Sequence, residues 1–296
     1  ENKAFASACD GVTPGTTPDC PVMIYDAPGL NAMRNHLEGH FALGADIDLS
    51  AYLSPGGAGY NGGDGWDPVG SGGVLSNAFR GTFNGNGHTI SNLKIESTAG
   101  SVGLFGATSG ATIRNIGLID VDIVGAGETS NVGGLVGYLN GTIENAYVTG
   151  TVKGADQVGG LVGYAYGVTI APSRISASYA SAEVTGTGDG DVGGLVGHAV
   201  GYDLGITESF YNSSLTGPSA AGLGLTTPQM KQASSFGSWF TGTSPWAILE
   251  GMTFPIHRTT LEQISLDELT LNDGAVAYTP AFAASTSTYS SRVTGE

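Results

Sequence analysis

The chain is 296 residues long, which allows one large domain or two ordinary ones with a substantial core. Acidic residues outnumber basic ones by 26 to 10, so the formal net charge at pH 7 is −16. Such a surface repels phosphate groups, and no apolar run of 18 residues occurs. We therefore expect no nucleic-acid partner and no membrane insertion.

Glycine is unusually abundant, at 50 residues, against a typical share of about 7%. The chain has no Gly-x-y triplet repeat, and its hydrophobic content of 40% is too high for a disordered linker. We therefore expect glycine to serve turns and close backbone contacts within a folded protein.

Residues 1–23 form the first predicted segment and contain the only cysteines, Cys9 and Cys20. A disulfide between them would fix an otherwise flexible loop, whereas the alternative is two free thiols. We expect the disulfide, which indicates an oxidising, extracellular compartment. Because the chain begins with Glu1 rather than Met, we expect either a removed signal peptide or a fragment.

Two irregular segments follow. Residues 29–41 carry Leu30, Met33 and Leu37 at helical spacing, which predicts a short amphipathic helix that caps one end of the fold. Residues 54–73 are rich in Gly and Pro and predict an excursion from the regular structure, anchored by Trp66.

The phrase Gly-Leu-x-Gly recurs through the middle of the chain, with starts 31, 26 and 34 residues apart. A period of this size predicts stacked structural units. We interpret Gly222-Leu223-Gly224 as a decayed fifth copy. The four intact copies are residues 103–106, 134–137, 160–163 and 194–197.

A second set of positions recurs with the phrase. The alignment starts from Ile90, Ile113, Ile143, Ile175 and Ile206. Two residues on, it reads Asn92, Asn115, Asn145, Ala177 and Glu208; four residues on, its last three copies carry Tyr147, Tyr179 and Phe210. Short segments of β-branched and aromatic residues between Gly/Asn corners predict parallel strands, one repeat per turn. We expect the leucines to stack in an apolar column and the asparagines to form a ladder at a left-handed corner.

The phrase resembles the GLUG motif of bacterial surface and secreted proteins. The resemblance extends over residues 24–257 and includes Leu43–Ser50, Trp66–Gly70, Phe79–Ile90, Leu225–Met230, Trp246–Gly251 and Phe254-Pro255. It implies an all-β fold: a right-handed parallel β-helix with short capping helices, in an exported protein, commonly an adhesin. It implies no shared catalytic residues.

We expect a second cap after the repeats. Thr227 and Pro228 predict the N-cap and first residue of a short helix. Four aromatic residues beyond it are expected to cover the far end of the solenoid: Phe236, Trp239, Phe240 and Trp246.

Residues 258–296 change character and resemble a linker followed by the first strands of a cadherin-like β-sandwich. Such a sandwich needs about 100 residues, so these strands either continue in a longer protein or complete a sheet on another molecule by strand donation. The predicted assembly residues are Leu266, Leu269, Leu271, Tyr278, Phe282 and Tyr289.

The candidate metal ligands are aspartates at alternate positions. Asp46 and Asp48 share one face of a predicted strand, and Asp189 and Asp191 flank a glycine. Calcium prefers oxygen clusters, but the chain has no known calcium-loop signature. We expect no cofactor, with calcium at these aspartates as the alternative.

Basic residues are too scattered along the chain to predict the active site of a lyase. His88 and His198 lie within the repeated sequence segments, where a turn or stacking role is expected. The sequence predicts a non-catalytic structural or adhesive module that acts as a rigid spacer, with itself or a surface glycan as its partner. The alternatives are a filament subunit joined by its C-terminal strands and a carbohydrate-binding or polysaccharide-degrading β-helix.

Overall fold

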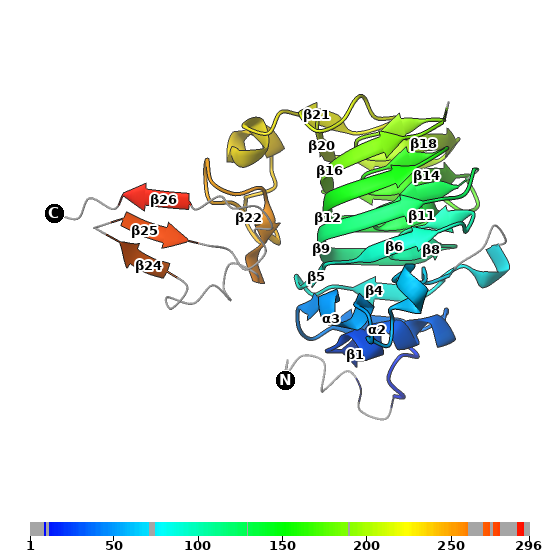
Figure 1. The fold of residues 1–296 in the computed structure, drawn as a ribbon. Coiled ribbons are helices and arrows are strands. Elements are labelled where there is room, and N and C mark those ends of the chain that lie inside the picture. The colour runs from blue at the N-terminus through cyan, green and yellow to red at the C-terminus, as the bar shows by residue number, and fades with distance from the viewer. Residues whose placement is uncertain are drawn as a thin grey trace.

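The computed structural model describes residues 9, 12–70, 75–128, 130–188, 190–259, 269–272, 275–278 and 289–292. The fold is a β-solenoid of about four turns, in which three sheets of parallel strands stack turn upon turn (Figure 1). Helical segments are few and short, as the predicted all-β parallel fold requires.

The largest sheet forms one long side of the solenoid. In order, its main strands are β1 (Val22–Ile24), β2 (His40–Leu43), β4 (Thr82–Asn84), β9 (Ala111–Gly125), β12 (Gly141–Gly154), β16 (Tyr179–Gly186), β20 (Phe210–Asn212) and β21 (Leu223–Leu225). Shorter strands complete it: β3 (Ile47–Asp48), β5 (Thr89–Ser91), β6 (Lys94–Ser97), β15 (Ser173–Ser176) and β19 (Leu204–Thr207).

Two smaller parallel sheets close each turn. One contains β7 (Ser101–Val102), β10 (Asn131–Gly133), β13 (Val158–Gly159) and β17 (Val192–Gly193). The other contains β8 (Phe105–Ala107), β11 (Val136–Leu139), β14 (Val162–Gly167) and β18 (Val196–Gly201).

The Gly-Leu-x-Gly phrase lies at the junction between these two small sheets. All four leucines (Leu104, Leu135, Leu161 and Leu195) are buried in the inner core. The amides of Leu135 and Val136 both donate to the carbonyl of Leu161, at 3.0 and 3.2 Å. A Cβ on Gly134 would stand 2.5 Å from the carbonyl oxygen of Gly160, so the preceding glycine is required by the close approach of successive turns. The predicted leucine column is confirmed.

The predicted left-handed corner is also confirmed. Asn115 and Asn145 have φ of 53° and 52°, and Ala177 and Glu208 adopt the same conformation at 45° and 46°. The Asn145 side-chain amide donates to the Asn115 side-chain oxygen at 3.1 Å, which forms the expected ladder.

The predicted alignment of the first turn is wrong. Phe83, not Ile90, is in register with Ile113, while Ile90 pairs with Leu118. In the first turn, residues 85–88 separate β4 from β5. The Ile-x-Asn pattern that begins at Ile90 therefore lies in β5, whereas the position equivalent to Ile113 lies in β4. The Asn115 side chain accordingly donates to Asn84.

Gly222-Leu223-Gly224 is not a fifth copy of the phrase. Leu223 pairs with Phe210 in β21, and 59% of its surface is exposed, whereas the phrase leucines lie inside. The end of the last turn is covered instead by residues 213–222. There the Ser219 hydroxyl accepts from the amides of Leu195 and Val196, at 3.1 and 2.9 Å.

The segment after β21 does not cover the far end either. Residues 229–259, here called the strap, begin with the 3-10 turns η4 (Gln229–Lys231) and η5 (Ala233–Phe236). They continue through the antiparallel pair β22 (Trp246–Ala247) and β23 (Ile256–His257). The strap lies along the flank of the solenoid, beside the long strands (Figure 1).

The strap creates a second hydrophobic core outside the solenoid. Tyr147, Tyr179 and Phe210 are in register and face outward, and the strap buries them beneath Phe236, Trp239 and Trp246. Large aromatic residues such as these need to be buried by another segment. The sequence does not distinguish a covering segment on the flank of the solenoid from one at its far end. The expected helix at Thr227 is only the 3-10 turn η4, with Pro228 at its N-cap.

The strap descends the solenoid against successive turns. The Tyr179 hydroxyl donates to the Pro255 carbonyl at 2.7 Å. His257 Nε2 lies 2.9 Å from the Asn145 carbonyl, and since a carbonyl only accepts, this nitrogen carries the proton. The Thr259 hydroxyl donates to the Asn86 carbonyl at 3.4 Å, in the turn that contains β4.

The N-terminal end is capped by α2 (Ala27–Ala32), which continues as η1 (Met33–Asn35). Asp26 is its N-cap and accepts from the Gly29 amide at 2.8 Å, so the helix begins and ends earlier than predicted. Leu30 and Met33 are buried as expected, and β2 starts at His40.

The predicted excursion is present after α3 (Ser50–Leu53) and includes η2 (Asn61–Gly63); η3 (Leu75–Asn77) follows it. Trp66 is buried and donates its indole N–H to the Leu104 carbonyl at 3.2 Å, which confirms its anchoring role.

Candidate functional site

The first pair of predicted calcium ligands is occupied by hydrogen bonds from the protein. Asp46 accepts from the Thr89 amide at 2.7 Å and contacts His88 Nδ1 at 3.2 Å. Burial raises the pKa of Asp46, but the bonds from His88 and Thr89 outweigh it, and the net shift is downward. Asp48 accepts from the Ser50 amide and the Asn92 side chain, both at 2.8 Å.

Of the second pair of predicted calcium ligands, only Asp191 lies within the described residues. Asp189 lies outside the described residues, and Asp191 pairs with His198 Nδ1. In the part of the chain that the structure describes, no group of three or more His, Cys, Asp or Glu side chains is placed to hold a metal ion.

The expected stacking role of His198 is confirmed. Its ring stacks on Tyr164 with centroids 5.3 Å apart, and Tyr164 stacks on Tyr138 at 5.3 Å. These rings form an aromatic ladder across β11, β14 and β18 on the outer face of the solenoid. Burial, followed by the neighbouring tyrosines, raises the pKa of Tyr138.

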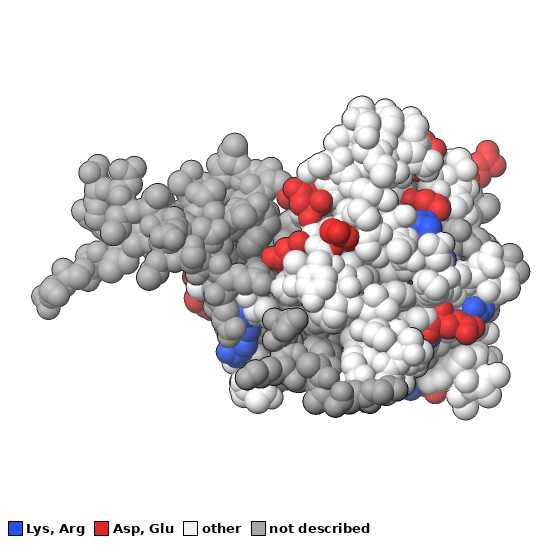
Figure 2. All heavy atoms as spheres, turned by 90° about the horizontal axis from the view of Figure 1, so that it is seen from below, with Lys and Arg blue, Asp and Glu red and all other residues white. Residues whose placement is uncertain are grey.

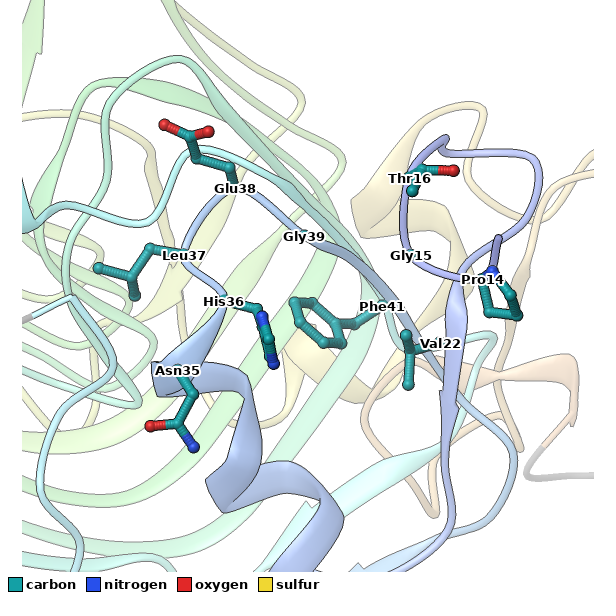
Figure 3. Close-up of a pocket in the computed structure, with 10 residues that line it drawn as sticks. All are labelled: Pro14, Gly15, Thr16, Val22, Asn35, His36, Leu37, Glu38, Gly39 and Phe41. Atoms are coloured by element: carbon teal, nitrogen blue, oxygen red, sulfur yellow. The ribbon is translucent and has the colours of Figure 1, made fainter. Parts of the chain in front are cut away.

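A cavity of about 540 Å3, here called the base pocket, opens at the N-terminal end of the solenoid (Figure 3). Its lining consists of Pro14, Gly15, Thr16, Val22, Asn35, His36, Leu37, Glu38, Gly39 and Phe41. Val22 and Phe41 are in register on β1 and β2, and Figure 3 shows the His36 ring beside Phe41. Cavities of this size hold small ligands, and here apolar residues adjoin a polar rim.

The loop closed by the disulfide forms one wall of the base pocket, through Pro14, Gly15 and Thr16. Cys9 and Cys20 are bonded as predicted, and Cys20 is buried. The Gly15 amide donates to the Cys20 carbonyl at 2.7 Å, and the His40 amide donates to the Gly15 carbonyl at 3.1 Å. The disulfide therefore holds the loop against the first strands. Sequence reasoning missed this pocket because its walls come from two segments that are separate in the chain.

The predicted assembly residues fall partly within the described chain. Leu266 and Phe282 lie outside it. β24 (Leu269–Asn272), β25 (Ala275–Tyr278) and β26 (Tyr289–Arg292) form an antiparallel sheet. Leu269 is opposite Tyr278, and Tyr278 is opposite Tyr289, so three of the named residues share one row of this sheet. The resemblance of this segment to cadherin-like domains is not confirmed.

Charge is distributed without a dominant basic surface on the face drawn in Figure 2. Acidic groups occur there in several separate places, and the few basic groups are isolated. Among the described residues, no helix is long and apolar enough to cross a membrane.

The sequence model of the GLUG motif matches residues 128–153, which include the second Gly-Leu-x-Gly phrase and most of β12. The chain carries a GLUG motif. Halomucin from Haloquadratum walsbyi is 39% identical over 154 residues, which are 50% of this chain and 2% of that protein. A protein provisionally named as a Gly-rich membrane protein, from Evansella cellulosilytica, is 40% identical over 136 residues, which are 45% of this chain and 15% of that protein.

The GLUG solenoid also resembles a crystal structure. A protein provisionally named as an immunoglobulin A1 protease, from Bacteroides ovatus, matches with a TM-score of 0.52 and 25% identity over 67% of each chain. One of the two sequence relatives carries the name of a membrane protein, and both are many times longer than the segments matched.

The GLUG repeat predicts the inner core of the solenoid but not the position of the strap on its flank. The signal for the lateral position of the strap is the outward column of Tyr147, Tyr179 and Phe210, whose large apolar rings demand cover from another segment.

Proposed function

We propose that this chain is a non-catalytic, extracellular adhesive module of a larger surface protein. The observation that carries the proposal is that the recurring GLUG residues are used in stacking. The four leucines are buried, and the asparagine corner bonds to itself. The names and great length of the sequence relatives support a module within a surface protein.

The candidate chemical groups support the same proposal. Asp46 accepts from Thr89 and Asp48 from Asn92, both in the neighbouring turn, and His198 is stacked on Tyr164 and paired with Asp191. Each of these side chains has a structural partner that accounts for its position.

Adhesion is tested with beads coated with the full chain, under flow, over three immobilised probes: the chain itself, a neutral polysaccharide and an acidic polysaccharide. We expect retention on the neutral polysaccharide, since a net charge of −16 repels the acidic one; retention on the chain itself requires contacts between copies that outweigh the same repulsion. No retention on any probe contradicts the adhesive role. Cleavage of either polysaccharide, or of immunoglobulin A1, contradicts the non-catalytic role.

The alternative of a filament subunit is favoured by one observation, the small antiparallel sheet of β24–β26: within the described residues it has three strands, fewer than a sandwich. Electron microscopy of the full chain tests it. Polymers that disappear when residues 264–296 are deleted support strand donation, and isolated particles from the full chain contradict it.

A further inference from the structure

The path of the strap decides how this module is connected to the rest of its protein. In a solenoid used as a spacer, the chain enters at one end and leaves at the other. Here the chain enters the solenoid at β1 and completes its last turn at β21, seven strand positions away in the sheet. At about 4.8 Å between neighbouring strands, this distance is about 34 Å along the axis.

The chain does not leave the solenoid at that far end. The strap returns along the flank, with Pro255 at the turn of Tyr179, His257 at the turn of Asn145 and Thr259 at Asn86. Asn86 follows β4, which is two strand positions from β1. The point where the strap ends is therefore about 10 Å from the entry strand along the axis.

The return path is held by packing as well as by these hydrogen bonds. Trp246 stacks on Trp239 and on the His257 ring, both at 4.6 Å between centroids. Tyr147 adds a further contact with His257 at 5.4 Å. A Cβ on Gly87 would meet the Thr259 hydroxyl at 2.4 Å, so the strap is in close contact with the first turns.

We infer that the solenoid is a side branch of its protein, attached by its first turns, and not a spacer placed in line. Both connections to the chain lie near β1 and β4, and the last turn, closed by Ser219, is the free end. Tension along the protein then passes across the base of the solenoid and does not extend its length. The inference concerns the path of the chain and holds whether or not the module is adhesive.

Electron microscopy of the full chain with two globular tags tests this inference. One tag is fused before Glu1, another after Glu296, and biotin–streptavidin at Tyr202→Cys marks the last turn. Tyr202 is 99% exposed, so the label does not disturb the core. We expect both fused tags at the end of the particle opposite streptavidin. A C-terminal tag beside streptavidin overturns the inference.

A second variant tests whether the strap itself holds the C-terminal tag at the base of the solenoid, or whether the two termini lie close together for another reason. Trp246→Ser with His257→Ser removes the stacked pair, and we expect the C-terminal tag to move toward the streptavidin end. Thr243→Ala is the matched control, because Thr243 is an exposed residue of the same strap. If the double variant unfolds, the position of the tags in the unsubstituted chain still decides. A tag that stays at the base in the folded double variant also contradicts the inference.

Discussion

The Ser219 hydroxyl lies 3.1 Å from the Leu195 amide and 2.9 Å from the Val196 amide, in the position that a leucine carbonyl occupies in the two preceding turns. The corresponding amides of Leu161 and Val162 both donate to the Leu195 carbonyl, at 2.9 and 3.1 Å. The Ser219 hydroxyl oxygen thus replaces the leucine carbonyl that a further turn would supply. The two backbone donors at the end of the solenoid are therefore satisfied.

Ser219→Ala should therefore loosen the last turn. Two amides lose their acceptor, and one buried donor without a partner costs about 1–3 kcal/mol. We expect faster hydrogen exchange at Leu195 and Val196 and a lower free energy of unfolding in urea. Ser213→Ala, at an exposed serine of the same segment, is the control. Equal exchange rates in the two variants would show that Ser219 does not cap the turn.

The left-handed corner predicts a stabilising substitution. Ala177 has φ of 45°, a conformation that costs most residues about 1–2 kcal/mol and that asparagine tolerates better. Ala177→Asn should raise the free energy of unfolding by about 0.5–1 kcal/mol, since it also extends the ladder above Asn145. Asn145→Ala should lower it by at least as much. Urea titrations of both variants check the signs, and a stabilised Asn145→Ala would contradict the role of the corner.

His257 makes the strap sensitive to acid. Burial lowers its pKa from 6.5 to about 4, although the bond to the Asn145 carbonyl acts in the opposite direction. Between these values the unfolded chain binds more protons than the folded one, so the free energy of unfolding falls as the pH falls. The loss reaches about 3 kcal/mol near pH 4 and is absent above pH 6.5.

Tryptophan fluorescence reports this change, because Trp239 and Trp246 lie in the strap. The urea midpoint should fall between pH 6.5 and 4, and His257→Gln should remove most of that slope. Thr243→Ala should retain it. Asp46, whose pKa is lowered, loses its contribution only below its ordinary value of 3.8, outside this window. A slope unchanged in His257→Gln would assign the acid sensitivity to another group.

The disulfide should stabilise the base more than the solenoid. Cys9 and Cys20 are separated by 11 positions, and closing a loop of this size contributes about 2–3 kcal/mol where the loop is ordered. Cys9→Ser with Cys20→Ser should raise hydrogen exchange at His40, whose amide donates to the Gly15 carbonyl. Exchange at Leu135, in the inner core, should not change. Equal acceleration at both sites would show that the loop supports the whole fold.

Much of the solenoid could be predicted because its turns repeat chemically distinctive residues. Leu135 and Leu161, or Asn115 and Asn145, occupy the same place in successive turns, so spacing alone aligns them. The first turn departs from the alignment because Phe83 takes the place of the isoleucine and residues 85–88 separate β4 from β5, whereas β9 and β12 are continuous at the corresponding position. Periodicity contains no information about such an exception.

The candidate sites were less predictable than the fold. Val22 and His36 line the same pocket, and His257 contacts Asn145. Neither pair occupies equivalent positions of a sequence repeat, so spacing along the chain does not predict that they meet. The aspartates were selected by alternation, which places Asp46 and Asp48 along one strand edge but does not reveal that Thr89 and Asn92 already occupy them. Long-range partners of this kind follow from the path of the chain, not from local pattern.

The strap also acts as a ruler for the number of turns. Pro255, His257 and Thr259 contact the turns of Tyr179, Asn145 and Asn86 in that order, along an extended segment. An additional GLUG repeat inserted between β9 and β12 would stack as well as its neighbours, yet it would move the Asn86 contact one turn away from Thr259 while the contacts at Tyr179 and Asn145 stayed in place. Repeat number and strap length must therefore change together, although nothing in the inner core limits how far the stack could grow.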